Sequence, residues 1–564
     1  MNSVEEIRFG VMCNKDLTFP KWQADTIYSL MNHEKISCEL LILNVEVSSH
    51  NFLSRLGQVN YKSFLWQIYS YFFGRHSKIT KRVSLNKELF NIPRLECLVH
   101  KKGKFSQFFE AGDIKSIKET DLDFILRFEF GIIKGDILNS STHGVWSFHH
   151  GDEEEFRGGP PGFWEIYEGK KITGSILQKL NEKLDAGIVL KKCFLETQLN
   201  YIENRDQIFL ESSRWPLQVC LKLLSNNNEL PSIEASSTKA IVKVAPTNLQ
   251  FINFILRVTL SKIKKIYRMV MYVDQWNIGI VNNKPHSFLG NNNTYQINWF
   301  PLNSKKVFYA DPCALETENG LDIFFEEYAY IKGRGVISYS KYLNGKFTDP
   351  KVVLDEGFHL SYPYVFEDKG LKYMIPETFE ANKIMLYQAI DYPKKWEMVK
   401  VLINEYAGID NTILRYDGIW WMFSSDKNDG SSHNLNLFFA DGLFSDWKPH
   451  PCNPVKTDIR SSRSAGNPFI YNNNIYRPSM NYEDKTEGSI TINLIVDLSK
   501  TSYEEISLKS IFPFKKSRFP DKTHHLFSSK NFTLIDGCKE TLILSSKEML
   551  FRQASRIIHR ILRY

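Results

Sequence analysis

A spaced repeat in the second half of the chain constrains its fold most. Four segments share the order apolar run, turn, apolar run, and their starts near 312, 363, 411 and 468 lie 51, 48 and 57 residues apart. Their turns carry Asn319-Gly320, Lys369-Gly370, Asp417-Gly418 and Asn472–Asn474, residue types that favour tight β-hairpins. A period of about 50 residues built from strand pairs is typical of a β-propeller with one blade per repeat. We therefore predict an all-β, five-bladed propeller over 273–540, with Ile278–Leu289 and Leu526–Gly537 closing the fifth blade.

The first 240 residues have a different pattern, in which apolar runs alternate with amphipathic segments. Ile7–Met12, Glu39–Val45 and Leu122–Arg127 are predicted to be buried strands, and Trp22–Asn32 is predicted to be a helix. Residues 46–110 are predicted to be rich in helix. This order indicates an α/β domain over 1–240, with a parallel sheet and a site at the C-terminal ends of its strands. The sequence has no Gly-x-Gly-x-x-Gly motif, so it does not indicate a dinucleotide cofactor.

The residues best suited to catalysis lie between Trp146 and Leu190. The predicted strand Val145–Phe148 ends at His149 and His150, and Asp185 follows His149 by 36 positions in a glycine-containing loop. A carboxylate can orient an imidazole and stabilise its charged form, so His149 and Asp185 suit general base catalysis. A buried structural histidine is the alternative for His149. For His150, contact with a ligand and a local hydrogen bond are equally compatible with the pattern.

The same stretch resembles the folate-dependent formyltransferases, which include the methionyl-tRNA and the sugar N-formyltransferases. His149, Arg157-Gly158 and Leu184-Asp185-Ala186-Gly187 match the family pattern in order and spacing. The resemblance implies a Rossmann-like formyltransferase domain that moves a formyl group from N10-formyltetrahydrofolate, as co-substrate, to an amine. His149 would take the proton from the amine, and Asp185 would orient His149.

The resemblance also implies roles for residues around this pair. Ser147 stands where the family has an asparagine that holds the formyl carbonyl, and a serine hydroxyl can donate one hydrogen bond there. The backbone of Phe130, Gly131, Ile132 and Ile133 falls where the family contacts the pterin, and Gly187 is assigned to the same co-substrate site. His150 and Arg157 are assigned to substrate binding, and an ion pair with the adjacent acids is the alternative for Arg157.

The repeats resemble the propellers of family 43-type glycoside hydrolases. They are more similar to the N-terminal domain of plant glucosamine inositolphosphorylceramide transferases, through HLSYPYVFEDKGLKYMIPET and RSAGNPFIYNNNIYRPSMNY. Asp311, Glu377 and Asp410 border predicted inner strands, where carboxylates would point into a central funnel. A glycosidase needs an acid/base pair, but Gly466-Asn467 occupies the fourth equivalent position. We predict that the three carboxylates bind a sugar, with hydrolysis or structural packing as alternatives.

Charge and composition narrow the range of partners. A net charge of +7 over 564 residues is too mild to indicate nucleic acid binding. Basic residues gather in Ser261–Arg268, inside a predicted connecting helix at 241–272, and in a predicted amphipathic helix at 541–564. Both segments suit either a solvated helix face or weak contact with an anionic membrane. In the connecting helix, Leu249, Ile252, Ile255 and Leu256 lie near helical spacing.

Cysteine usage and the absence of apolar stretches indicate a location. The eight cysteines are scattered and form no metal-binding spacing, so we expect no metal, and reduced thiols in the cytoplasm. Peripheral contact with the inner face of the membrane is a further expectation. The N-terminus does not resemble a signal peptide, and no apolar run reaches the length of about 18 residues that spanning requires. The pattern indicates no particular oligomeric state.

These features together predict a formyltransferase acting on an amino sugar. The acceptor is expected to be nucleotide- or lipid-linked, because the second domain resembles carbohydrate-active propellers. One alternative is a carbohydrate-binding or scaffold protein with an inactive formyltransferase domain, since serine replaces asparagine at 147. Another is a glycosidase or glycosyltransferase activity of the propeller. Formylation of transfer RNA is disfavoured, because no basic C-terminal β-barrel is evident.

Overall fold

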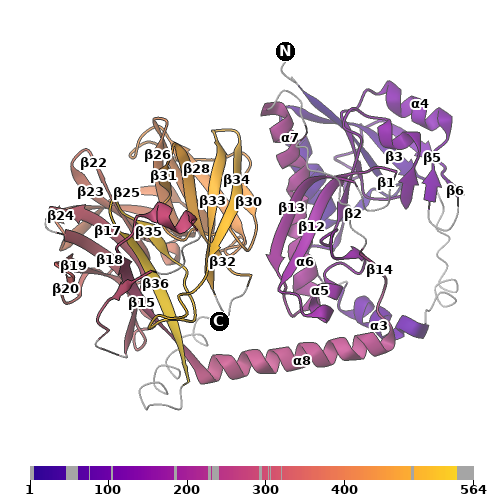
Figure 1. Ribbon diagram of the computed structural model, residues 1–564. Coiled ribbons are helices and arrows are strands. Elements are labelled where there is room, and N and C mark those ends of the chain that lie inside the picture. The colour runs from indigo at the N-terminus through magenta and orange to yellow at the C-terminus, as the bar shows by residue number, and fades with distance from the viewer. Residues whose placement is uncertain are drawn as a thin grey trace. The chain divides into compact units, whose positions relative to one another are not determined.

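The computed structural model describes residues 6–45, 61–74, 77–102, 106–182, 187–225, 230, 240–290, 295–302, 304, 306–318, 320–483 and 488–542. The chain divides into two compact units, Met1–Lys262 and Ile263–Tyr564, and the division lies inside helix α8 (Asn248–Met271) (Figure 1). Most of the predicted helix at 541–564 lies outside the described residues, and 541–542 end strand β36 (Thr533–Leu542). Within the described part of the chain, no helix is both long enough and apolar enough to cross a membrane.

A seven-stranded sheet organises the first unit (Figure 1). Its order is β13-β12-β10-β8-β1-β3-β5. The five strands from β10 to β5 run parallel, while β12 is antiparallel to β10 and β13. The α/β prediction is confirmed, with an antiparallel edge in addition. The strands are β1 (Ile7–Asn14), β3 (Ile36–Asn44), β5 (Arg94–Cys97), β8 (Phe124–Arg127), β10 (Val145–His149), β12 (Ile172–Lys179) and β13 (Ile188–Glu196).

Both faces of this sheet are covered, as expected for parallel strands with continuous apolar runs. One face packs against α1 (Lys21–Met31), α6 (Tyr201–Ser213) and α7 (Trp215–Ser225), and its core includes Phe124 and Trp146. The other face packs against α4 (Ala111–Glu119), and its core includes Ile125 and Val145. Because side chains alternate along a strand, Arg127, Ser147 and His149 belong to the α4 face, at the C-terminal ends of β8 and β10.

The segment before α4 contains less helix than predicted. Its described residues form α3 (Phe64–Phe72) and four short strands, β4 (Arg82–Ser84), β5, β6 (His100–Lys102) and β7 (Ser106–Phe108). β5 extends the main sheet, and β7 pairs with β9 (Ile132–Lys134). Strands of three or four residues are too short to show a period-two pattern, so periodicity could not reveal them.

The second unit contains five antiparallel sheets within its described residues. Four follow one another along the chain, and the fifth joins the start and end of the unit through β15 (Tyr272–Val281) and β36. The all-β prediction is confirmed, whereas a closed, five-bladed arrangement stays a prediction. The four consecutive sheets are β17 (Val307–Thr317), β18 (Gly320–Ala329), β19 (Arg334–Leu343) and β20 (Lys346–Phe347); β22 (Ser361–Asp368), β23 (Leu371–Glu377), β24 (Lys383–Asp391) and β25 (Lys395–Asn404); β26 (Gly408–Tyr416), β27 (Ile419–Asp426), β28 (Asn434–Ala440) and β29 (Lys448–Pro449); β31 (Phe469–Tyr471), β32 (Asn474–Asn481), β33 (Ser489–Leu498) and β34 (Tyr503–Ile511). β16 (Ile297–Trp299) and β35 (Leu526–Ser528) complete the fifth, while β21 (Lys351–Leu354) and β30 (Lys456–Thr457) attach to β19 and β28.

The hairpins predicted from the repeat are present. Lys369-Gly370, Asp417-Gly418 and Asn472-Asn473 have φ angles between 49° and 78° at both central residues. This geometry is that of the type I′ turn, whose twist matches the paired strands. Asn319, in the remaining turn, lies outside the described residues.

A second repeating feature is a backbone irregularity early in each repeat. Asp311, Tyr362, Asp410 and Gly466 have φ angles of 52°, 44°, 50° and 115° at corresponding positions. At the first three, the register with the next strand shifts. Positive φ in non-glycine residues costs on the order of 1–3 kcal/mol and concentrates at functional sites. Three of these four positions therefore store strain within the first strands of their sheets.

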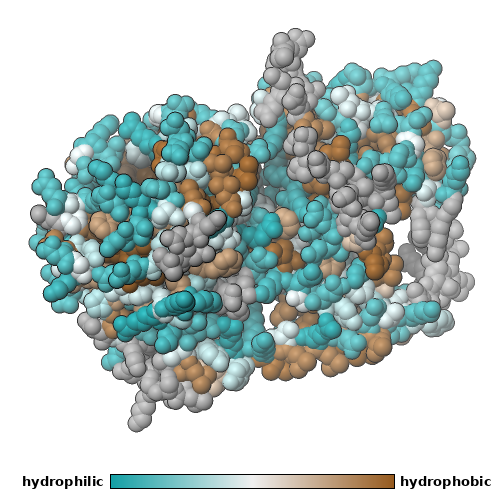
Figure 2. All heavy atoms as spheres, viewed as in Figure 1, coloured by the Kyte–Doolittle hydropathy of each residue, from teal (hydrophilic) through white to brown (hydrophobic). Residues whose placement is uncertain are grey.

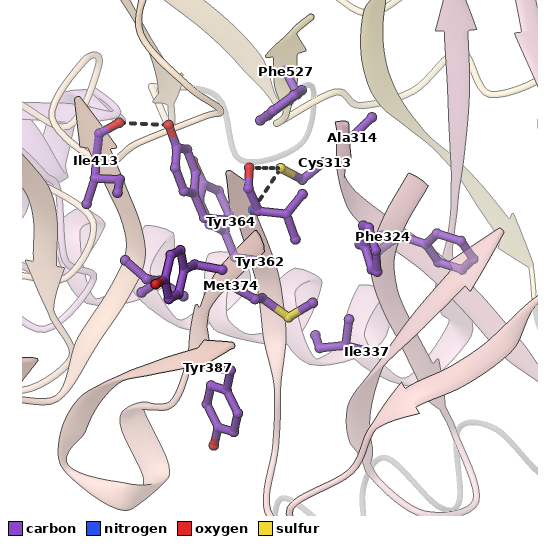
Figure 3. Close-up of a cluster of buried hydrophobic side chains, with 14 of the residues drawn as sticks. Cys313, Ala314, Phe324, Ile337, Tyr362, Tyr364, Met374, Tyr387, Ile413 and Phe527 are labelled. Atoms are coloured by element: carbon purple, nitrogen blue, oxygen red, sulfur yellow. Dashed lines mark hydrogen bonds between the residues drawn. The ribbon is translucent and has the colours of Figure 1, made fainter. Parts of the chain in front are cut away.

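The first strands of successive sheets pack around one apolar core (Figure 3). The Val365 N–H in β22 donates to Cys313 Sγ in β17 at 3.2 Å, and Tyr364 OH donates to the Ile413 carbonyl in β26 at 2.7 Å. The first three of the four consecutive sheets therefore contact one another in chain order through their first strands.

Candidate functional site

His149 and His150 face opposite sides of the sheet, because successive residues of a strand alternate. His149 is buried, and its Nε2 lies 2.8 Å from the Phe156 carbonyl oxygen. A carbonyl oxygen can only accept, so Nε2 carries the proton in the neutral ring. Nδ1 then keeps the lone pair that a general base needs.

His150 packs as an aromatic ring on the other face. Its ring centroid lies 4.6–5.7 Å from the rings of Trp22, Phe148 and Phe209, and its Nδ1 lies 3.3 Å from Ser175 Oγ. Burial, with a smaller contribution from His149, lowers the pKa of His150 to about 3, so the ring is neutral. These contacts favour the local hydrogen bond over ligand contact, which stays untested.

A cavity of about 170 Å³ adjoins His149 on the α4 face. The cavity is lined by the C-terminal ends of β8, β10 and β12, by the residues that follow β8, and by the residues that follow β12. The lining residues are Arg127, Gly131, Ile132, Ile133, Lys134, Phe148, His149, Gln178, Leu180, Asn181 and Glu182. The predicted base and three of the four predicted pterin-contacting residues therefore meet. The cavity is small and would hold little more than one flat ring system.

The remaining predicted residues of this site have varied surroundings. Phe130 precedes the cavity at a φ of 67°, where it turns the chain toward Gly131. Gly187 is tightly packed, since a Cβ there would lie 2.4 Å from the Lys179 carbonyl oxygen and 2.7 Å from Gln178 Oε1. Glycine is thus required for packing beside Gln178, which lines the cavity. Asp185 lies outside the described residues, so its pairing with His149 stays a prediction.

Ser147 is buried and holds the side chain of Arg127. Its Oγ accepts from Arg127 Nη2 at 2.8 Å and from Nε at 3.2 Å. Arg127 Nη1 donates to the carbonyl oxygens of Phe130 at 3.0 Å and Gly131 at 2.7 Å. The guanidinium is therefore fixed on the cavity wall. Our sequence analysis missed Arg127, although a charged residue ending a buried strand at the predicted site edge was a usable signal.

Arg157 lies in a separate two-stranded pairing. β11 (Arg157–Gly158) pairs with β14 (Val242–Lys243), and Arg157 Nη1 donates to the Ala240 carbonyl at 3.4 Å. The guanidinium is not part of the lining of the His149 cavity. Its predicted contact with substrate stays a prediction.

The predicted carboxylates of the second unit form a buried cluster. Asp311 Oδ1 lies 3.1 Å from His524 Nε2, and His524 Nδ1 lies 2.7 Å from Asp536 Oδ2. Asp410 forms an ion pair with Arg463, and its N–H donates to Glu377 Oε2 at 3.0 Å. Asp311 and Asp410 are two of the positive-φ positions, so the irregularity early in each repeat turns side chains toward this cluster. His524 and Asp536 carried no spacing signal.

Charges within this cluster differ from residue to residue. Burial raises the pKa of Glu377 to about 8, Asp410 adds to the rise, and Arg463 opposes it. Burial, with the charges of Asp311 and Glu377, holds the pKa of Glu326 well above its usual value. For Asp311, burial acts to raise the pKa, but the hydrogen bond and charge of His524 outweigh it and leave the pKa lowered. Neutral carboxyl groups therefore lie beside a charged carboxylate, and the two forms can donate to and accept from hydroxyl groups.

Three residues of this cluster lie close enough together to hold a metal ion. The ligand atoms of Asp311, His524 and Asp536 all lie within 4.8 Å of one another. We expected no metal from the sequence, because the expectation relied on local spacing and these residues are far apart in the chain. A protonated His524 can hold the two carboxylates together in place of a metal ion. Burial acts to lower the pKa of His524, but Asp536 and Asp311 outweigh it and raise the pKa well above its usual value.

Comparison with known proteins finds two kinds of transferase. Residues 299–529 match the family described as glucosamine inositolphosphorylceramide transferase 1, N-terminal. The Arabidopsis thaliana protein of that name is 32% identical over 250 residues, which are 42% of this chain and 32% of the relative. A methionyl-tRNA formyltransferase of Bacillus thuringiensis subsp. konkukian is 30% identical over 127 residues, which are 22% of this chain and 38% of the relative.

The solved structures that are similar to this chain include a formyltransferase. A sugar N-formyltransferase from a Shewanella species covers 44% of this chain and 87% of its own, with 13% identity and a TM-score of 0.27. The chain spans about a third of the length of the curated relatives it matches. The resemblances to the formyltransferases and to the glucosamine inositolphosphorylceramide transferases are therefore also found by sequence comparison.

Proposed function

We propose that the first unit transfers a formyl group from N10-formyltetrahydrofolate to the amine of an amino sugar. The observation that carries this proposal is the cavity in which His149 and Arg127 lie beside Gly131–Ile133. Sequence similarity to a formyltransferase supports the type of reaction. Similarity of the second unit to a transferase named for glucosamine supports a carbohydrate acceptor, nucleotide- or lipid-linked. We propose a cytoplasmic location, because the eight cysteines are buried and none of them forms a disulfide.

His149 acts as the base in this proposal. Its Nε2–H is held by the Phe156 carbonyl, so Nδ1 accepts the proton that the amine loses as it attacks the formyl carbon. The same carbonyl stabilises the imidazolium that results. Asp185 would add a negative charge beside it, as the family resemblance implies. The bond between the formyl carbon and N10 then breaks, and the proton held on Nδ1 passes to N10 of the departing tetrahydrofolate.

Arg127 stabilises the charge that develops on the formyl oxygen. Its guanidinium is anchored by Ser147, Phe130 and Gly131 and needs no reorganisation during the reaction. Such fixed donors at a developing negative charge lower the barrier. The serine therefore positions Arg127, and in this proposal Arg127 replaces Ser147 as the group that holds the carbonyl.

The proposal is tested by incubating the full-length protein with N10-formyltetrahydrofolate and a panel of amino sugars. The panel contains free glucosamine, dTDP-linked 3-amino and 4-amino sugars, a UDP-linked 4-amino sugar and a polyprenyl-phosphate-linked amino sugar. We expect tetrahydrofolate release and a formylated product, detected by mass spectrometry, with one of these classes. Binding of the stable analogue 5-formyltetrahydrofolate without turnover of any acceptor would instead support an inactive, scaffold-type domain.

We further propose that the second unit is a five-bladed propeller whose central carboxylates bind the sugar. Five antiparallel sheets, contacts between their first strands, and one irregularity per repeat support this arrangement. Carboxylates accept paired hydrogen bonds from neighbouring sugar hydroxyls. We propose no glycosyl transfer by this unit. The matching family is the N-terminal part of much longer relatives, so the match does not include most of the protein that the name describes.

Asp311→Asn is expected to weaken binding of the accepted amino sugar by about tenfold, since the loss of a charged acceptor costs about 1.5 kcal/mol. Calorimetry on the full-length protein measures this affinity. Affinity for 5-formyltetrahydrofolate should stay unchanged and serves as the control. Steady release of reducing sugar from a glycoside, abolished by the same change, would contradict sugar binding alone and support a glycosidase.

A further inference from the structure

Helix α8 has two apolar faces, and the fold of the chain uses one of them. Phe251 and Phe254 are buried in a cluster with Trp66 and Phe163 of the first unit. On the helix, seven apolar residues spaced by three or four positions are 39–68% exposed, and we call them the α8 stripe. They are Leu249, Ile252, Leu256, Leu260, Ile263, Tyr267 and Val270. At about 100° per residue, this stripe lies opposite Phe251 and Phe254.

The exposed stripe is a continuous feature of the surface. Figure 2 shows hydrophobic residues gathered along the helix that Figure 1 labels α8. Scattered exposed apolar residues are ordinary in proteins, but contiguous apolar surface indicates an interaction site. Stripe residues extend from the first turn of α8 to its last.

The charges on α8 indicate what covers the stripe. The helix has 24 residues, five of them basic and none acidic, namely Arg257, Lys262, Lys264, Lys265 and Arg268. Arg257 donates to the Tyr167 carbonyl and Arg268 pairs with Glu540, whereas the three lysines are exposed. An amphipathic helix with cations beside an apolar face has the composition of helices that lie in the interface of anionic membranes.

Helix α3 adds exposed aromatic surface beside the start of α8. Asn248 Nδ2 donates to the Tyr61 carbonyl at 2.7 Å, and Asn248 Oδ1 accepts from Leu65 N at 3.0 Å. In and next to α3, Tyr61, Phe64, Tyr71, Phe72 and Phe73 are 44–83% exposed. Aromatic side chains are enriched at the boundary between headgroups and acyl chains.

We propose that α8 and α3 dock the protein on an anionic membrane surface. The α8 stripe enters the boundary of the acyl chains. At about 100° per residue, Lys262 and Lys264 flank the stripe and lie among the lipid phosphates, whereas Lys265 lies on the opposite side of the helix. A second copy of the chain is a poorer occupant, because it would bring two basic helices together. This inference does not rest on formyl transfer, although docking would bring a lipid-linked acceptor to the protein.

The test is co-sedimentation of the full-length protein with extruded vesicles. One set contains phosphatidylcholine alone, and the other contains phosphatidylcholine and phosphatidylglycerol at 3:1. We expect binding to the anionic vesicles that weakens as salt is raised, because ions screen the lysines. Replacing Lys262 and Lys264 together with glutamine should weaken that binding by about 30-fold.

Ile263→Glu tests the apolar stripe and should weaken binding by at least about tenfold. The matched control is Ile331→Glu, the same change at a residue that is 62% exposed in the turn between β18 and β19. The control should bind as the wild type does, and equal melting temperatures show that both variants fold. Failure of the wild type to sediment, or full binding by Ile263→Glu, would overturn the inference. A dimer in light scattering that Ile263→Glu dissociates, without vesicle binding, would instead assign the stripe to a second copy.

Discussion

Replacing His149 with alanine is expected to lower kcat for formyl transfer by about two to four orders of magnitude, the usual loss when a positioned base is removed. The ring is held through Nε2 by the Phe156 carbonyl, which leaves Nδ1 to accept the proton. Among the described residues that line the cavity, His149 is the one histidine. Steady-state release of tetrahydrofolate with the best acceptor of the panel measures the loss. Affinity for 5-formyltetrahydrofolate should change little, because we propose that the pterin contacts the Gly131–Ile133 backbone.

The neighbouring histidine provides a matched control for this prediction. His150→Phe keeps an aromatic ring in the cluster of Trp22, Phe148 and Phe209, so its kcat should stay within a few-fold of the wild type. Asp185→Asn should fall in the range of His149→Ala if the two residues act as a pair. A folded His149→Ala protein with a rate near that of the wild type would exclude His149 as the base.

Replacing Arg127 with glutamine is expected to lower kcat by about 10²–10³-fold, the loss typical of removing a fixed donor to a developing oxyanion. KM for the acceptor should stay nearly constant, because the charge is needed in the transition state rather than in the ground state. Ser147→Ala should cost less, about tenfold, since a hydrogen bond to a charged group is worth about 1.5 kcal/mol. The guanidinium keeps its bonds to the carbonyl oxygens of Phe130 and Gly131 in that variant.

Kinetics of a double variant, compared with the single variants, distinguish two roles for Arg127: stabilising the transition state and binding the acceptor. Arg127→Gln combined with Ser147→Asn restores the asparagine of the family and should recover part of the lost rate. Steady-state kinetics of both single variants and the double variant measure kcat and KM separately. If Arg127→Gln raises only KM for an anionic acceptor, Arg127 binds the acceptor and does not hold the formyl oxygen.

Local patterns in the sequence were enough to predict most of the elements. The φ angles of hairpin turns depend on two residues, so Lys369-Gly370 and Asp417-Gly418 predicted tight hairpins, which the structure contains as type I′ turns. An apolar run such as Ile7–Met12 can be recognised from consecutive residues alone, and it predicted a strand that is buried in the sheet. His149 was found because a strand end and a family motif coincide, and strand geometry then places it at the sheet edge.

Contacts between distant residues were decided by the tertiary structure alone. Arg127 and Ser147 meet only because β8 and β10 are neighbours in register, and Asp311 meets His524 only because the two ends of the second unit share a sheet. Helical spacing predicted α8, but spacing cannot tell which of two apolar faces will be buried. Packing of Phe251 and Phe254 on the first unit decided that choice and left the opposite stripe exposed, since the free energy of burial depends on a partner surface that the helix does not encode.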